Sequence, residues 1–176
     1  MVNYPNKKKN NHYTSMIEGK HNTAHRGMNL EEDINLTNEY YLSHDIAVIH
    51  KKPTPIQIVK VSYPERSSAK IVEAYFRTPS TTDYNGIYKG KYIDFEAKET
   101  KTLSFPFTNI SLHQINHLDK VIHHGGIAFL IIAFTKVNEV YLLDASFMVE
   151  AYRKNDRKSL RYETIKEKGH LIRQGF

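Results

Sequence analysis

The sequence contains no cysteine, so it can form neither a disulfide framework nor a thiolate metal site. Its first residues, MVNYPNKKKNNHY, lack the apolar segment that is typical of a secretory signal. The longest apolar run, residues 127–134, is far too short to span a bilayer. These absences favour a soluble, cytoplasmic protein with no membrane partner.

Acidic residues are fewer than basic ones, 19 against 25, which gives a formal net charge of +6. The 176 residues suffice for one compact domain, and the mean hydropathy of −0.56 suggests polar appendages on it. Residues 1–25 are rich in Asn, Lys and His with little periodicity, which predicts a mobile basic tail. The charge favours a polyanionic partner, although a solvated basic surface has the same composition.

Helical and extended patterns follow one another along the chain, which indicates an α/β domain around a mixed sheet. Acidic residues in the first turn predict a helix from Leu30 to about Ser43. A second helix is expected over residues 112–124, ended by Gly125-Gly126. Strands are expected at 46–50, 127–134 and 140–143, and a basic helical tail from residue 147.

Residues 51–77 form a longer excursion than a connector needs. Pro53 and Pro55 interrupt the pattern, and Pro64 to Ser67 is typical of a turn between two extended segments. A projecting arm is favoured over a lid because the segment is strongly basic. Its basic residues are Lys51, Lys52, Lys60, Arg66, Lys70 and Arg77.

Acids and lysines crowd among aromatic residues in STTDYNGIYKGKYIDFEAKETK, residues 80–101. A two-residue turn at Lys89-Gly90 would place Asp83 opposite Glu96. The same register places Thr81 opposite Lys98, on the same face of the hairpin. Opposed carboxylates, with Cβ atoms roughly 4.5–5.5 Å apart, repel each other unless a cation lies between them. This register therefore predicts a site for a hard divalent cation, with Mg²⁺ as the natural candidate.

A second register is also open. Asn85-Gly86 is a stronger hairpin signal than Lys89-Gly90. Centred there, Asp83 would face Tyr88 and the group of four side chains would be lost. The first register has the advantage that residues 91–98 remain one strand.

Two other functional classes are open. His113 and His117 stand four residues apart and could chelate zinc from one helix, but no third ligand is evident. The other class is a non-catalytic, basic DNA-binding or architectural protein acting on branched DNA, which the charge and the arm support.

The order Asp83, then Glu96-Ala97-Lys98, resembles the D…(D/E)-x-K arrangement of metal-dependent nucleases with the restriction-endonuclease-like fold. More closely, the chain resembles the RecU family of bacterial Holliday junction resolvases, from about Arg26 to Leu143. The shared stretches are RGM (26–28), IAVIHKKPTP (46–55), YPERS (63–67), STTDYNGIYKGKYIDFEAKET (80–100), SFP (104–106) and HQINH (113–117).

This resemblance implies a restriction-endonuclease-like α/β fold, with a central mixed sheet flanked by helices and a projecting stalk. The single nuclease domain would span residues 26–176, with the stalk inserted at about 53–80. The implied activity is Mg²⁺-dependent, with Mn²⁺ as a possible substitute. It is paired, symmetric phosphodiester cleavage of Holliday junctions in DNA recombination and repair.

The resemblance also implies roles for particular residues. Asp83 and Glu96 correspond to the metal-binding carboxylates of the family, and Thr81 and Gln114 to its other metal-site positions. Lys98 corresponds to the lysine that stabilises the transition state. Four of these five residues are the ones that the first hairpin register selects, so the resemblance favours that register.

Weaker correspondences involve an additional acid and the contacts with DNA. Glu31 resembles the first-helix glutamate of archaeal resolvases. Arg26 matches an N-terminal family arginine, and Arg66 lies in the stalk segment that enters the junction. The remaining expected DNA contacts are Lys51, Lys52, Lys70 and Arg77.

The expected substrate is four-way junction DNA. A symmetric junction must be cut at two opposed points, which calls for two active sites related by a dyad and hence a homodimer. The resemblance further implies the RecA recombinase and the branch-migration machinery as partners, and association with the nucleoid when the protein is engaged on DNA.

Overall fold

The computed structural model describes residues 30–64, 68–77, 81–154 and 156–173. These residues fall into two units, which we describe separately. The larger unit comprises residues 29–54 and 78–176, and the smaller contains residues 55–77. The predicted N-terminal tail, Arg26 and Arg66 lie outside the described residues.

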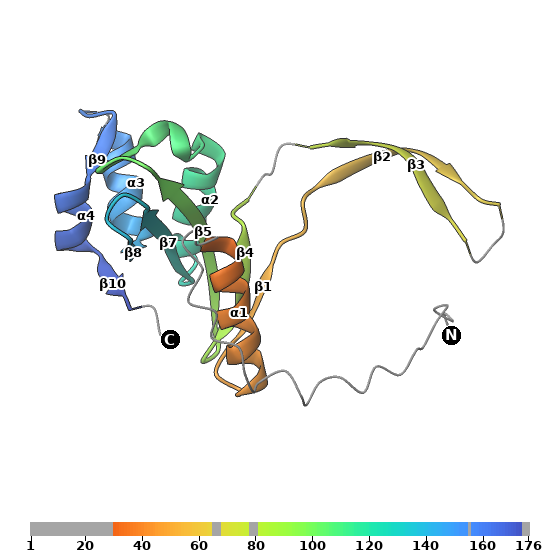
Figure 1. Ribbon diagram of the computed structural model, residues 1–176, viewed down its shortest axis with the longest axis horizontal. Coiled ribbons are helices and arrows are strands. Elements are labelled where there is room, and N and C mark those ends of the chain that lie inside the picture. The colour runs from red at the N-terminus through yellow and green to blue at the C-terminus, as the bar shows by residue number, and fades with distance from the viewer. Residues whose placement is uncertain (1–29, 65–67, 78–80, 155, 174–176) are drawn as a thin grey trace. The chain divides into compact units, whose positions relative to one another are not determined.

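The larger unit is built on a six-stranded sheet with the strand order β1-β4-β5-β7-β8-β10 (Figure 1). β5 and β7 run parallel, whereas the other neighbouring strands are antiparallel. The predicted α/β fold with a mixed central sheet is therefore confirmed. The strands are β1 (Val48–Lys51), β4 (Tyr84–Tyr88), β5 (Lys91–Thr100), β7 (Ile127–Phe134), β8 (Glu139–Asp144) and β10 (His170–Ile172).

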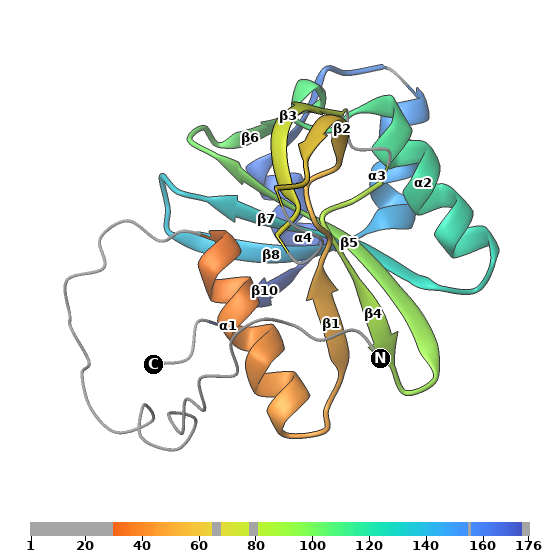
Figure 2. The same cartoon turned by 90° about the vertical axis from the view of Figure 1, so that its right-hand side faces the viewer.

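Helices cover both faces of this sheet, with α1 (Leu30–Ser43) on one and α2 (Leu112–His123) and α3 (Ala145–Lys154) on the other (Figure 2). β7 is apolar throughout because it is buried on both sides. Leu130 and Ile132 pack in the core beneath α2 and α3, whereas Ile131 and Ala133 pack in the core beneath α1. None of the helices within the described ranges is long and apolar enough to cross a membrane.

The predicted helix boundaries agree closely with the structure because their signals are local. Ser111 and Gln114 form a capping box at the start of α2, in which the Ser111 backbone N–H donates to Gln114 Oε1 at 3.0 Å. After α2, Gly125 adopts a φ of 80°, which stops the helix where the sequence predicted.

The tail is more complex than the single basic helix that the sequence predicted. After α3, β9 (Ser159–Arg161) pairs with β6 (Ser104–Pro106). The short helix η1 (Phe107–Asn109) comes directly after β6 in the chain. α4 (Tyr162–Lys168) and β10 complete the chain, and β10 joins the sheet beside β8. The buried side chains Leu160 and Ile165 hold this tail in the core, so long-range packing decides its structure.

The hairpin of β4 and β5 adopts the first of the two predicted registers. Tyr88 pairs with Lys91, and the pairing continues to Tyr84 and Phe95. Lys89 and Gly90 form the turn with φ values of 47° and 77°, both in the left-handed region. Asn85-Gly86 lies inside β4, so the alternative register is wrong.

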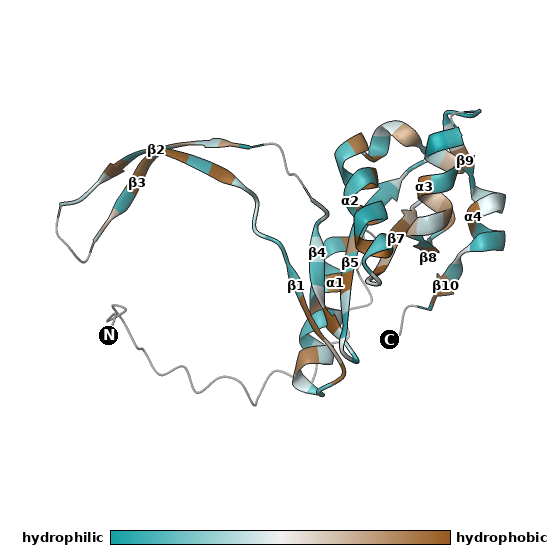
Figure 3. Cartoon of the chain, turned by 180° about the vertical axis from the view of Figure 1, so that it is seen from behind, coloured by the Kyte–Doolittle hydropathy of each residue, from teal (hydrophilic) through white to brown (hydrophobic). Residues whose placement is uncertain are grey.

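The smaller unit is a two-stranded antiparallel sheet of β2 (Ile56–Ser62) and β3 (Lys70–Phe76). The Arg77 N–H donates to the Pro55 carbonyl oxygen at 2.9 Å and closes its base. Nearly every side chain of the two strands is exposed, and Figure 3 shows hydrophobic residues on both of them. The predicted arm is thus an extended hairpin.

Candidate functional site

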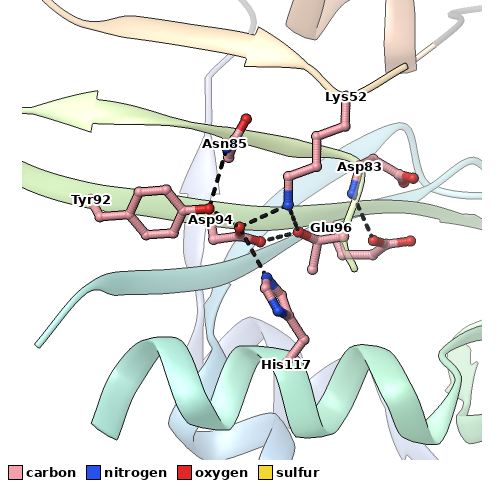
Figure 4. A network of polar contacts seen from close by, with 8 residues as sticks. Lys52, Asp83, Asn85, Tyr92, Asp94, Glu96 and His117 are labelled. Carbon is pink, nitrogen blue, oxygen red and sulfur yellow. Dashed lines mark hydrogen bonds and ion pairs between the residues drawn. The ribbon is translucent and has the colours of Figure 1, made fainter. Parts of the chain in front are cut away.

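The site lies on the face of the sheet that α2 covers, where β5 presents two buried carboxylates. Side chains alternate along a strand, so Asp94, Glu96 and Lys98 project to the same face. Asp94 and Glu96 are both fully buried. A buried carboxylate needs partners to be stable, and the two acids have different sets of partners (Figure 4).

Glu96 is contacted on both of its carboxylate oxygens. Lys98 Nζ lies 2.6 Å from Oε1, and the Gln114 amide donates to the same oxygen at 2.6 Å. The backbone N–H of Asp83 donates to Oε2 at 3.1 Å (Figure 4). Gln114 itself is fixed by the helix cap, because its Oε1 accepts from Ser111. Helix α2 and the start of β4 therefore both orient Glu96.

The electrostatic environment of Glu96 favours binding of a cation. Burial raises the pKa of Glu96 to about 7; Lys98 opposes this, and the neighbouring carboxylate of Asp83 adds to it. A divalent ion bound beside both carboxylates would offset the repulsion that helps to raise the pKa of Glu96, and hard cations prefer such oxygen donors. Asp83 and Glu96 therefore fit a divalent metal ion.

Asp83 is held by its backbone at the point where β4 begins. Its carbonyl oxygen accepts from the Lys52 N–H at 2.7 Å, one position beyond the last rung between β1 and β4. Thr81 lies in a bend before β4 and is half-buried. The hydroxyl that reaches the buried acids is that of Thr82, which donates to Asp94. The structure thus brings together Asp83, Glu96, Lys98 and Gln114 of the five predicted residues.

A second polar cluster surrounds Asp94, and the sequence analysis did not identify it. Lys52 Nζ lies 2.8 Å from its Oδ2, and the Tyr92 hydroxyl donates to the same atom at 2.7 Å. His117 Nε2 lies 3.1 Å from Oδ2, close enough for an ion pair when the imidazole is protonated. Burial opposes ionisation of Asp94, but hydrogen bonds from Lys52, Thr82 and Tyr92 outweigh it and lower the pKa. One signal was present in the sequence, since Asp94 precedes Glu96 by two residues in one strand.

Glu31, the possible additional acid, forms an ion pair with Lys51 that is exposed to solvent. This pair joins the first turn of α1 to β1. Within the described ranges, no group of three or more His, Asp or Glu side chains is arranged to hold a metal ion. Glu31 therefore pairs with a lysine of β1, while His113 Nε2 lies 3.1 Å from Ser111 Oγ and His117 Nε2 lies 3.1 Å from Asp94 Oδ2, so the two imidazoles have separate polar partners.

The basic residues predicted to contact DNA have different environments. Lys51 pairs with Glu31, and Lys52 pairs with Asp94. Lys70 and Arg77 are exposed and belong to the smaller unit. Only the last two are thus free surface cations among the four that the structure describes.

Comparison with known proteins extends the resemblance seen in the sequence. A family model described as "RecU: Recombination protein U" matches residues 25–176, which includes the tail beyond Leu143. The Holliday junction resolvase RecU of Bacillus cytotoxicus is 55% identical over 182 residues, covering 99% of this chain and 91% of that protein. The RecU of Bacillus thuringiensis is 55% identical over 184 residues, with the same coverage.

A solved structure is also similar. It is Hjc of Archaeoglobus fulgidus, described as a Holliday junction resolvase from an archaeal hyperthermophile. The identity is 11% and the TM-score is 0.47, with 81% of this chain and 93% of that chain covered.

Proposed function

This chain belongs to the RecU, or Recombination protein U, family, and from that premise we propose that it is a Holliday junction resolvase. It is an endonuclease that cuts four-way DNA junctions in recombination. Relatives that carry this name are 55% identical over 99% of the chain. We assign the cleavage activity to the site described above because Asp83, Glu96 and Lys98 lie together on one face of the sheet.

Asp83 and Glu96 would hold a divalent cation, and Mg²⁺ is the ion we propose, with Mn²⁺ as a substitute. Such an ion supplies charge neutralisation at the scissile phosphate and activation of the attacking water. Thr81 would add an oxygen ligand from its hydroxyl or carbonyl group. Gln114 would act on Glu96, because its amide already donates to that carboxylate.

Lys98 supplies the second positive charge of the site. Its ammonium lies 2.6 Å from Glu96 and its side chain remains 27% exposed, so it can reach a bound phosphate. We assign to it the stabilisation of the negative charge that develops as the phosphodiester bond breaks. Glu96 must be ionised to bind the cation, and the Lys98 ammonium favours that form.

Cutting a symmetric junction at opposed points needs two such sites, so we propose a homodimer in the cytoplasm, associated with the nucleoid when on DNA. Residues 26–176 would form the nuclease domain, with the stalk at about 53–80 and a basic tail at 1–25. Lys70, Arg77, Arg26 and Arg66 would contact phosphates or partners, among them RecA and the branch-migration machinery.

A junction-cleavage assay tests the proposal against the alternative, a non-catalytic binder of branched DNA. Purified protein is mixed with an end-labelled synthetic four-way junction or a linear duplex of the same sequence, with Mg²⁺, with Mn²⁺ or with EDTA. We expect paired nicks at symmetric positions in the junction only, and none with EDTA. Stable junction binding without nicking in either metal would establish the binder instead.

A further inference from the structure

The two chain segments that connect residues 55–77 to the larger unit meet at one buried side chain. Lys52 lies just before that hairpin and Thr82 just after it, and both belong to the larger unit with β5. Lys52 Nζ bonds both Asp94, at 2.8 Å, and the Thr82 hydroxyl, at 2.9 Å. The Thr82 hydroxyl also donates to Asp94. Asp94 thus binds the incoming and the outgoing segment to β5.

This triangle also determines where Asp83 lies. Asp83 follows Thr82 directly, and its carbonyl oxygen accepts the Lys52 N–H at 2.7 Å. Figure 4 shows Lys52 reaching down to Asp94 while Asp83 lies beside Glu96. Asp83 is therefore linked to Asp94 in two ways. Thr82, the residue before it, donates to Asp94, and Lys52, whose N–H bonds the Asp83 carbonyl oxygen, forms an ion pair with Asp94.

The Asp94 carboxylate is already bound by several protein groups. Both of its oxygens are occupied, Oδ1 by Thr82 and Oδ2 by Lys52 and Tyr92, with His117 beside Oδ2. The residue is fully buried, and a buried carboxylate that loses its charged partner is strongly destabilised. These contacts are all with protein groups, and they hold separate segments of the chain together.

We infer that Asp94 is a positioning residue for the metal site: its carboxylate ties Lys52 and Thr82 together and thereby fixes Asp83 opposite Glu96. The inference rests on the proposed function for the identity of the metal site. It adds that the affinity for the metal depends on a lysine and a threonine at the base of the hairpin, neither of which is a ligand.

The test measures metal binding and cleavage separately. Mn²⁺ affinity of the DNA-free protein is determined by electron paramagnetic resonance for the wild type, Asp94→Asn, Lys52→Met and Thr82→Val. Substitution of a residue that orients metal ligands typically lowers the metal affinity by roughly 10–100-fold. We therefore expect Mn²⁺ binding to weaken by about tenfold or more in each variant. Cleavage should fall at low Mg²⁺ and recover in part at high Mg²⁺. Junction binding in EDTA should be unchanged in Asp94→Asn and Thr82→Val.

Two controls separate positioning from general damage. Glu139→Gln alters another carboxylate that accepts tyrosine hydroxyls, those of Tyr141 and Tyr162, but on a different strand, β8. It should leave Mn²⁺ affinity unchanged. Tyr92→Phe removes a donor to Asp94 without touching Lys52 or Thr82, and should change the affinity less than Lys52→Met does.

The outcomes are distinct. Wild-type affinity for Mn²⁺ in folded Lys52→Met and Thr82→Val would overturn the inference, and these two variants decide the matter if Asp94→Asn does not fold. A wild type that binds Mn²⁺ but cuts no junction would overturn the proposed function and leave the positioning role of Asp94 standing.

Discussion

A Cβ atom placed on Gly86 would lie 2.0 Å from the carbonyl oxygen of Val48, on the neighbouring strand β1. It would also lie 2.7 Å from the Cα of Ile49. Position 86 therefore excludes a side chain because the backbone of β1 passes directly over it. The glycine of Asn85-Gly86, which in sequence looks like half of a tight turn, is needed for close strand packing in the middle of β4.

Gly86→Ala should therefore destabilise the protein more than Gly90→Ala. The first substitution forces β1 away from β4, which costs roughly 1–3 kcal/mol or more. At Gly90 the space is open, and only the positive φ of 77° is penalised, by about 1–2 kcal/mol. Urea denaturation of both variants measures the difference. Equal losses would show that β1 does not pack against Gly86 as described.

Local signals explain which parts of the fold could be predicted. The ends of α1 and α2 follow from residues within one turn, such as Ser111 and Gly125, and agree with the structure. The choice between two hairpin registers could not be made from the turn residues. Gly86 is required because the carbonyl oxygen of Val48, which is distant in sequence, leaves no space for a side chain there. The order of the strands in the sheet and the packing of the tail depend on long-range contacts in the same way.

The residues of the candidate site also differ in whether local sequence or distant contacts determine their positions. Asp83, Glu96 and Lys98 could be predicted because they lie on one hairpin, where alternation and register fix their faces. Asp94 was overlooked because its principal partner, Lys52, is 42 residues away, beyond the inserted hairpin. Thr81 was chosen by extending the strand alternation past Tyr84, but β4 begins there and the chain bends before it.

Asp83→Asn and Glu96→Gln should separate DNA binding from cleavage. Each removes a charge that the cation needs while preserving size, so junction cleavage in Mg²⁺ should fall by at least about 10²-fold. Junction affinity in EDTA should stay at the wild-type level or rise, because an acid beside the phosphate has been neutralised. Gel-shift and nicking assays on one labelled junction measure both. Cleavage at the wild-type rate in either variant would remove that residue from the site.

Lys98 should be needed for cleavage but not for metal binding. Its ammonium lies against Glu96 Oε1 and competes with a cation for that carboxylate. At a pH high enough to ionise Glu96 in both proteins, Lys98→Met should therefore bind Mn²⁺ at least as well as the wild type. Cleavage at saturating metal should nevertheless fall by about 10²-fold, since the charge near the phosphate is lost. Lys98→Arg, which keeps the charge, should lose less. Weakened Mn²⁺ binding together with full cleavage at high metal would instead assign Lys98 to construction of the site.

The raised pKa of Glu96 predicts how the stability of the metal-free protein depends on pH. Glu96 titrates at about 7 in the folded protein and near 4.5 when unperturbed. Between those values the folded state keeps a proton that the unfolded state has released. Stability from this group is therefore complete below about pH 4.5 and is lost as pH rises through 7, by roughly 1–3 kcal/mol.

Glu96→Gln provides the matched comparison, because it keeps the acceptor for Gln114 and cannot ionise. Urea denaturation in EDTA should show the wild type losing stability relative to Glu96→Gln from pH 5 to pH 8. The lowered pKa of Asp94 acts in the opposite direction at more acidic pH, but it is common to both proteins and cancels in the difference. Mn²⁺ must bind the ionised carboxylate, so the affinity of the wild type should rise with pH and level off above about 7. Parallel stability curves for the two proteins would mean that Glu96 is already ionised at pH 5. In that case a cation would not be needed to offset repulsion between Glu96 and Asp83.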